Sequence, residues 1–286
     1  MPRPLPATTA ALVCLASAVW GQAALAQQSE PSLEVRPTVA RPGDVVLVVV
    51  RGANGTPRGV AQGRTLRFYK FGDHHEALFA LPLETPAGPV TANVDASATS
   101  LSGAVEVQEV TFPLHELTVE QKFIAPPESV QARIAADQRA FTRAYKTAFG
   151  PRQFTLSFAR PREAEVTAHF GDQRMLNGKK KTTHYGLDLD GQVGDPVAAA
   201  NDGTVVLVRD CYTSGKTVLL SHGGGIFTGY FHLSAFKVKA GAKVKRGELI
   251  GLVGKTGRVT GPHLHFLVRA DKRYVNPESL LDLAFP

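Results

Sequence analysis

Short apolar or alternating runs, separated by turn-forming residues, dominate the first part of the chain. The clearest runs are DVVLVVV (44–50), TLRFYKF (65–71), EALFALPL (76–83) and AVEVQEVTF (104–112). Glycine- and proline-rich turns such as RPGD and PAGP separate them. Short runs rich in β-branched and aromatic residues, at this spacing, are typical of a small β-sandwich. We therefore predict an N-terminal β-sandwich-like domain over residues 27–120.

The hydrophobic period then changes to that of a helix. Apolar residues recur near a 3.6-residue period between a proline pair and a glycine, at Val130, Ile134, Phe141, Tyr145 and Phe149. A proline start and a glycine end are the usual boundaries of a helix. We predict one amphipathic helix within a helical linker over 121–152, packed between two domains.

Strand-like runs and glycine turns return from about residue 153, and only NPESLLDLAF near the end has a helical pattern. This predicts a mostly antiparallel β domain over 153–286. The fold class is therefore mainly β, with an N-terminal sandwich, a connecting amphipathic helix and a C-terminal antiparallel domain.

The N-terminal residues have the features of a secretory signal. Arg3 is followed by the apolar stretch AALVCLASAVW and by ALA at 24–26, a small-x-small cleavage pattern. An uncleaved anchor is the alternative, but the apolar stretch is shorter than the roughly 20 residues that span a membrane. We predict that residues 1–26 are removed, and that the mature chain is exported, periplasmic or secreted, without an integral span.

Charge and cysteine content narrow the range of partners. The net charge of the 286 residues is +7, and it falls to +6 without Arg3. A positive surplus suits an anionic surface such as a cell wall or membrane. No basic helix or aromatic-interleaved basic run is present, so no nucleic-acid partner is expected. Cys211 alone remains after signal removal, which excludes an intramolecular disulfide and predicts a small packed residue.

Several short motifs lack the residues that their chemistry requires. HELT (115–118) would need a histidine at 119 to form a zinc-protease helix, and Val119 stands there. DHHE (73–76) is interpreted as a solvated loop between two strands, and His222 in SHGGG as a turn residue. No G-x-S-x-G elbow of a serine hydrolase occurs.

The stretch KTTHYGLDLDG is a candidate metal site. On an extended strand residues i, i+2 and i+4 share a face, so His184, Gly186 and Asp188 should point the same way. An imidazole and a carboxylate then converge over a glycine that cannot obstruct them.

The stretch GRVTGPHLHF supplies two more histidines by the same period. His263 and His265 should share one face, while Leu264 and Phe266 turn into the core. A His/Asp/His set suits zinc, and three protein ligands leave a fourth position for water, as in catalytic sites. Satisfied surface or core histidines are the alternative, and the strand period does not say which of the two would bind. His232 in GYFHL is a candidate proton donor.

At these residues the sequence resembles the lysostaphin-type, LytM-like zinc metalloendopeptidases, which cut peptide bonds in bacterial peptidoglycan. The resemblance covers about 155–280, in the family's order, through FGDQRMLNG (170–178), HYGLD (184–188), GDPVAAANDGTV (194–205), GYFHLS (229–234), GELIGLVGKTGRVTGPHLHF (247–266) and VNP (275–277). One departure is Phe266, where relatives often have tryptophan, and we expect it to change the wall of the cleft.

The resemblance implies a role for each of the five residues. His184, Asp188 and His265 would hold one zinc ion per chain, and His263 and His232 would form the catalytic pair. We assign the base role to His263 and the oxyanion role to His232, and the reverse stays open. The implied activity is hydrolysis of peptide bonds in peptidoglycan stem peptides or cross-links by a zinc metallopeptidase domain over 153–286.

Two other functions remain as alternatives. One is a non-catalytic or autoinhibited wall-binding regulator of other cell-wall hydrolases, and the other is a zinc amidase of a different fold that cuts the sugar–peptide junction. The expected partner is a peptidoglycan peptide, and a regulatory or inhibitory protein is a second candidate. Residues 27–150 are expected to regulate or position the peptidase, so a fragment beginning near Gln153 should fold and cleave. Three lysines at 179–181 could contact stem-peptide carboxylates, although lysines in a loop are more often solvated.

Overall fold

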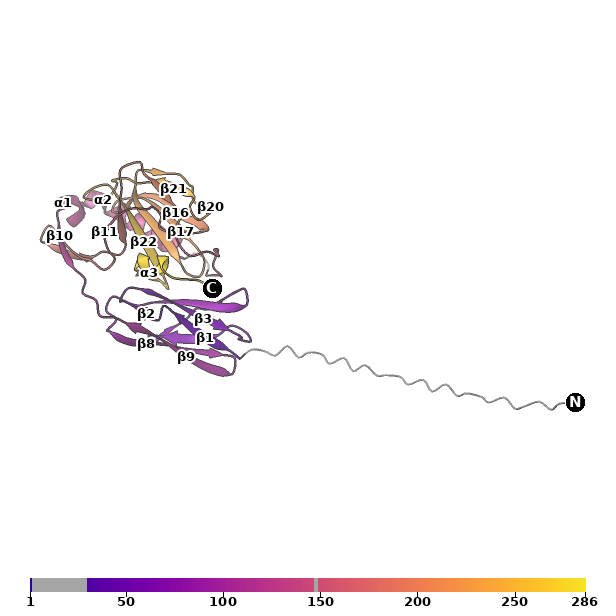
Figure 1. Ribbon diagram of the computed structural model, residues 1–286. Helices are drawn as coiled ribbons and strands as arrows, with labels where there is room; N and C mark the ends of the chain where they lie inside the picture. Colours follow the sequence, from indigo (N-terminus) through magenta and orange to yellow (C-terminus); the bar gives the residue numbers. More distant parts are fainter. Residues whose placement is uncertain (2–29, 147–148) are drawn as a thin grey trace.

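The computed structural model describes residue 1 and residues 30–146 and 149–286. Apart from Met1, the predicted signal peptide lies outside these residues. The described part is mainly β with three short to medium helices, which confirms the predicted fold class (Figure 1). No helix within the described ranges is both long and apolar enough to cross a membrane.

Two sheets form a sandwich at the N-terminal end of the described chain. One sheet has the order β1-β3-β7-β6, and the other has the order β2-β9-β8-β4-β5. The strands are β1 (Ser32–Arg36), β2 (Val39–Ala40), β3 (Val45–Arg51), β4 (Arg58–Ala61), β5 (Arg64–Thr65), β6 (Tyr69–Phe71), β7 (His74–Ala80), β8 (Gly88–Ala96) and β9 (Thr99–Val107). The predicted apolar runs thus contribute strands to the core of this sandwich, and β3 and β7 contribute to the C-terminal core as well.

Strand β3 is apolar on both faces because both faces are covered. Val46, Val48 and Val50 pack inside the sandwich. Val45, Leu47 and Val49 belong instead to the large C-terminal core. A half-exposed strand would alternate apolar and polar residues, whereas a strand covered on both sides is apolar throughout. The uninterrupted run VVLVVV therefore reflects two cores that meet at one strand.

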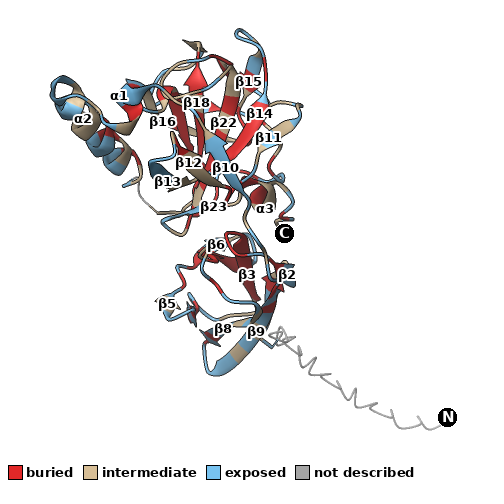
Figure 2. Cartoon of the chain, turned by 90° about the vertical axis from the view of Figure 1, so that its left-hand side faces the viewer, coloured by how far each residue is buried: buried red, intermediate tan, exposed pale blue. Residues whose placement is uncertain are grey.

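The segment after the sandwich adds a strand and two helices to the C-terminal part. Strand β10 (Leu114–Leu117) pairs in parallel with β12 (Gln173–Leu176), which pairs with β13 (Lys180–Thr183). Helices α1 (Gln121–Ile124) and α2 (Glu128–Ala144) follow. Figure 2 shows β10 exposed along most of its length.

Helix α2 does not lie between two domains as predicted. It packs against β16 (Gly203–Cys211) at the side of the C-terminal part (Figure 2). Its buried Asp137 fixes this position, since Oδ1 accepts from Arg209 Nε at 2.6 Å and Oδ2 accepts from the Tyr212 backbone N–H at 2.8 Å. The helical period correctly predicted the helix, but a polar contact decides where it docks.

The C-terminal part is built on a large antiparallel sheet, as predicted. Its order is β11-β14-β22-β18-β17-β16-β20 with β23 on β22, beside a small sheet β15-β21-β19. The strands are β11 (Val166–Ala168), β14 (Leu187–Asp190), β15 (Pro196–Ala198), β17 (Gly215–Ser221), β18 (Phe227–Leu233), β19 (Ala235–Phe236), β20 (Lys243–Val244), β21 (Leu249–Leu252), β22 (His263–Ala270) and β23 (Arg273–Val275). The expected last helix is α3 (Pro277–Leu281), whose first turn is capped by the Asn276 side chain.

The interpretation of DHHE as a solvated loop is wrong. His74, His75 and Glu76 begin β7 and are all buried, with Glu76 at 0% exposure. Glu76 Oε1 contacts His74 Nε2 at 2.9 Å, and Oε2 accepts from the Tyr69 hydroxyl at 2.6 Å. Buried polar groups are tolerated only when they are hydrogen-bonded, and this carboxylate is.

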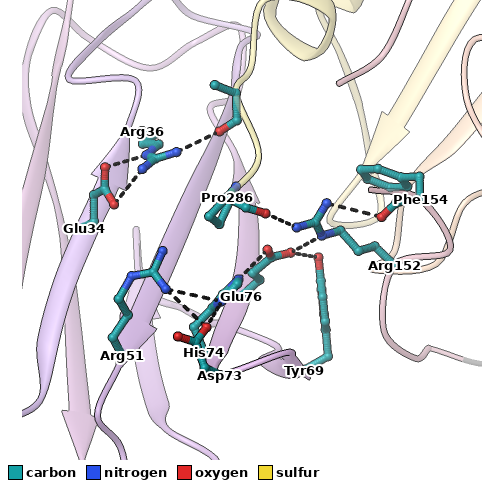
Figure 3. Close-up of polar contacts among 11 residues, drawn as sticks. Glu34, Arg36, Arg51, Tyr69, Asp73, His74, Glu76, Arg152, Phe154 and Pro286 are labelled. Atoms are coloured by element: carbon teal, nitrogen blue, oxygen red, sulfur yellow. Dashed lines mark hydrogen bonds and ion pairs between the residues drawn. The ribbon is translucent and has the colours of Figure 1, made fainter. Parts of the chain in front are cut away.

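Glu76 also joins the sandwich to the C-terminal part. Its Oε2 lies 3.2 Å from Nε of Arg152, and both side chains are fully buried (Figure 3). Arg152 further donates to the carbonyl oxygen of Phe154 at 3.2 Å and to an oxygen of Pro286. A second ion pair, Arg64 with Asp271 at 2.8 Å, fastens the turn between β22 and β23 to the sandwich.

Candidate metal centre

The predicted site residues are carried mainly by two neighbouring strands. β14 and β22 pair antiparallel, and their register sets Asp188 opposite His265 and Asp190 opposite His263. His184 precedes β14, which starts only at Leu187, so the predicted continuous strand from 184 to 188 is wrong. The side chains of His184 and Asp188 nevertheless converge.

Three donor atoms form a compact triangle. His184 Nε2 lies 3.0 Å from Asp188 Oδ1 and 3.0 Å from His265 Nδ1, and the last two atoms are 2.7 Å apart. Two ligands of a tetrahedral zinc ion, each about 2.0–2.1 Å from it, are about 3.3 Å apart. The triangle is slightly smaller than this, and its nitrogen and oxygen donors are those that zinc accepts. These three residues could therefore hold one metal ion.

Neighbouring groups orient the donors. The Nδ1–H of His184 donates to the His169 carbonyl oxygen at 2.8 Å, which leaves Nε2 as the free nitrogen. Asp188 Oδ2 accepts from Arg174 Nη2 at 2.7 Å, which leaves Oδ1 toward the histidines. Such outer contacts fix the tautomer and the orientation of metal ligands.

Gly186 makes room for His265, whereas the sequence had predicted only that this glycine would not obstruct His184 and Asp188. A Cβ at position 186 would lie 2.4 Å from Cε1 and 2.5 Å from Nε2 of that ring. Any larger residue would displace the imidazole.

The charge states suit a metal centre. Burial would raise the pKa of Asp188, but hydrogen bonds with His184 and His265 hold it well below its ordinary value. Burial also lowers the pKa of His265 to about 4. An ionised carboxylate and a neutral imidazole are the forms that bind divalent metals.

The other two predicted histidines lie beside the triangle. The rings of His232 and His263 are 5.1 Å apart between centroids, and His263 Nε2 is 3.7 Å from Asp188 Oδ1. Burial lowers the pKa of His232 to about 3, and this residue adopts a positive φ of 63°. Its Nδ1–H donates to the Thr256 carbonyl oxygen at 2.8 Å, while that of His263 donates to the Gly261 carbonyl oxygen at 3.0 Å.

All five predicted residues line one cavity of about 430 Å³. Its wall includes Leu117 and Val119 from the connecting segment, which the sequence had not indicated. It also includes Arg174 and Arg258, which the sequence did not predict as site residues although both lie in segments that resemble the peptidase family. The three lysines at 179–181 are exposed and do not line it.

Phe266 does not form the cleft wall that we expected. It is fully buried in the core and contacts Tyr230, with 5.5 Å between ring centroids. The phenylalanine in the cavity wall is Phe231, whose ring stacks on His265 with 5.2 Å between ring centroids, and Tyr185 and Tyr274 also line the cavity. The alternation that turns His265 outward turns its neighbour Phe266 inward.

Comparisons with known proteins agree with this geometry. The profile of Peptidase family M23 matches residues 182–277. Peptidoglycan DD-endopeptidase ShyA of Vibrio cholerae is 42% identical over 112 residues, which are 39% of this chain and 26% of that protein. Peptidoglycan DD-endopeptidase ShyB of the same organism is 34% identical over 176 residues, 61% of this chain and 38% of that protein. Both matches therefore span less than two thirds of the relative's length.

A solved structure extends the likeness to most of the chain. The crystal structure of a Pseudomonas aeruginosa protein assigned to peptidase M23 superimposes with a TM-score of 0.63 at 29% identity. The match covers 84% of this chain and 94% of that one, so the sandwich is part of the shared fold. The resemblance predicted from the sequence is thus confirmed: the chain carries a domain of peptidase family M23.

Proposed function

We propose that the chain is an exported zinc metalloendopeptidase that hydrolyses peptide bonds in peptidoglycan stem peptides or cross-links. The observation that carries this proposal is the convergence of His184, Asp188 and His265 in a cavity with two further histidines. Two relatives named peptidoglycan DD-endopeptidases support the substrate class. The proposal includes a removed signal over 1–26, a sandwich over 27–120, a linker over 121–152 and the peptidase domain over 153–286.

The donor set fits one zinc ion. His184 Nε2, Asp188 Oδ1 and His265 Nδ1 would hold it, and the cavity beside them leaves access for water and substrate. When bound, zinc supplies a Lewis acid that polarises the scissile carbonyl and makes water acidic enough to react near neutral pH.

The two remaining histidines would move the proton. Each donates its Nδ1–H to a carbonyl oxygen, so the neutral ring of His232 or His263 has its lone pair on Nε2. In this form each ring can accept a proton at Nε2. It can donate a proton from Nε2 only after it has accepted one there. Burial opposes a protonated His232. The Nδ1–H contact is the same in both rings and does not distinguish them, but a buried ring that resists protonation is the weaker base. The surroundings therefore favour His263 as the proton acceptor, the role assigned to it from the sequence.

Metal and activity measurements on single variants test the proposal. His265→Ala should lose both zinc and wall cleavage, because it removes a donor of the triangle. His263→Ala and His232→Ala should keep about one zinc per chain and lose rate, by roughly 10²–10⁴-fold for a general acid or base. Undiminished cleavage after complete chelation would overturn the zinc mechanism.

Mass spectrometry of digested wall separates the alternatives. New peptide termini are expected for an endopeptidase. A regulator without activity would release none, and an amidase would release whole stem peptides and leave free lactyl groups on the sugar chain.

A further inference from the structure

The cavity carries positive charge that the proposed mechanism does not use. Apart from its histidines, the charged residues in its wall are Arg174, Arg258 and Asp188. Asp188 is the acceptor for Arg174 as well as the partner of the histidine donors. Arg258 has no acidic partner among the described residues of this wall.

The backbone at Arg258 is anchored to a neighbouring turn. Its backbone N–H donates to the Thr213 carbonyl oxygen at 2.7 Å. The preceding Gly257 has a φ of 78° and approaches Gly215 so closely that a Cβ there would lie 2.4 Å from the Gly215 nitrogen. The loop before β22 is thereby fixed against the turn between β16 and β17, and Arg258 stays in the cavity wall.

The surroundings of Arg258 favour an anion. Burial, and then the charge of Arg174, lower the pKa of its guanidinium. A largely buried cation without a counter-charge costs free energy, and an anionic ligand would offset that cost. The planar guanidinium binds carboxylates through two parallel hydrogen bonds.

We propose that Arg258 is a specificity-determining residue that binds a free carboxylate of the substrate on the residue directly after the scissile bond. This inference rests on the proposed peptidoglycan endopeptidase function. Within a continuous peptide the α-carboxyl of that residue is consumed in the next peptide bond. At a cross-link the scissile amide joins an amino group whose residue can keep a free carboxylate. Arg258 would therefore select cross-links over those internal stem bonds in which the following residue keeps no free carboxylate.

Three synthetic peptides test the assignment on the zinc-loaded protein. They share one cross-linked sequence and carry free carboxylates, a carboxamide on the residue after the scissile bond, or a carboxamide on a residue before it. The kcat/KM of the wild type should be roughly 10- to 100-fold lower on the second peptide than on the first, as expected for the loss of one charge-assisted contact. On the third peptide it should match the first.

Variants at two positions complete the test. Arg258→Gln should lose a similar factor on the free peptide and should no longer distinguish the first two peptides. Arg258→Lys keeps the charge but loses the planar guanidinium. Its kcat/KM on the free peptide should lie between those of the wild type and Arg258→Gln. Lys255→Gln removes one charge from an exposed position of the same loop that does not line the cavity, and should match the wild type. Zinc content and circular dichroism identify any variant that is misfolded.

The outcomes separate this inference from the function on which it rests. If the wild type cleaves all three peptides equally, or if Arg258→Gln loses the same factor on all three, the carboxylate assignment is overturned while the endopeptidase function stands. Sensitivity to the third peptide alone would place the carboxylate before the bond and overturn the selection of cross-links. If the wild type cleaves none of them, the proposed function itself fails.

Discussion

Glu76→Gln tests the buried contact between the sandwich and the C-terminal part. The Glu76 and Arg152 side chains are both at 0% exposure, and 3.2 Å separates Oε2 from Nε. An arginine does not lose its proton, so the substitution leaves a buried cation without its counter-charge. Breaking one side of a buried pair costs about 3–5 kcal/mol. We expect a value near the lower limit, because Arg152 keeps its bond to Phe154 and stacks on Phe71, with 3.8 Å to the ring centroid.

Urea unfolding followed by circular dichroism measures this free energy. Arg152→Met should also destabilise, and the double variant with Glu76→Gln should be more stable than the sum of the single losses predicts. A coupling energy of about 2 kcal/mol or more is expected for partners in direct contact. Asp73→Asn is a matched control from the same network, because its exposed carboxylate should contribute no comparable stability (Figure 3).

Two results would refute the reasoning. Glu76→Gln could unfold at the wild-type urea concentration with an unchanged slope. The single losses could instead add without coupling in the double variant. Either outcome would mean that the pair contributes nothing beyond the apolar packing around it.

Three shorter predictions concern other parts of the C-terminal domain. Gly186→Ala should lower zinc affinity by about 10-fold or more, measured by competition with a chelator, because its Cβ would lie 2.4 Å from His265 Cε1. Burial lowers the pKa of His222 to about 4, so the unfolded chain binds a proton that the folded protein excludes. The free energy of unfolding should therefore fall by on the order of 3 kcal/mol between pH 6.5 and 4. In His222→Gln the melting temperature should depend less on pH over this range. Burial raises the pKa of Cys211, so alkylation at neutral pH should require urea, and labelling of the native protein would contradict this.

The alternation of polar and apolar residues correctly predicted β22, because the side chains of that strand do alternate between its two faces. In β22 the alternation turns His263 and His265 outward and leaves Leu264 and Phe266 at 0% exposure. The metal triangle needed one further fact, the pairing of Asp188 with His265, which joins segments 77 residues apart. The sequence resemblance supplied that fact, since no local pattern records a distant pairing.

The errors arise where a polar side chain finds a distant partner. Glu76 lies in a stretch that has the composition of a solvated turn, and its contacts with Arg152, Tyr69 and His74 make its burial possible. Asp137 looks like a surface residue of a helix, yet its contact with Arg209 determines the side on which α2 packs. Each outcome depends on a charge pair between residues that are distant in the sequence. Composition alone does not predict such pairs.

The uninterrupted apolar run VVLVVV indicates a strand that is covered on both faces. A sandwich sheet that faces water on one side needs polar residues at alternate positions, and VVLVVV in β3 has none. Val45, Leu47 and Val49 accordingly pack in the C-terminal core, next to residues such as Phe154. A fragment that begins near Gln153 would lose this cover and also Arg152, so its core would be exposed along one side. The expectation that such a fragment folds alone therefore conflicts with the run of valines, which indicates that the sandwich is part of the peptidase's folded unit.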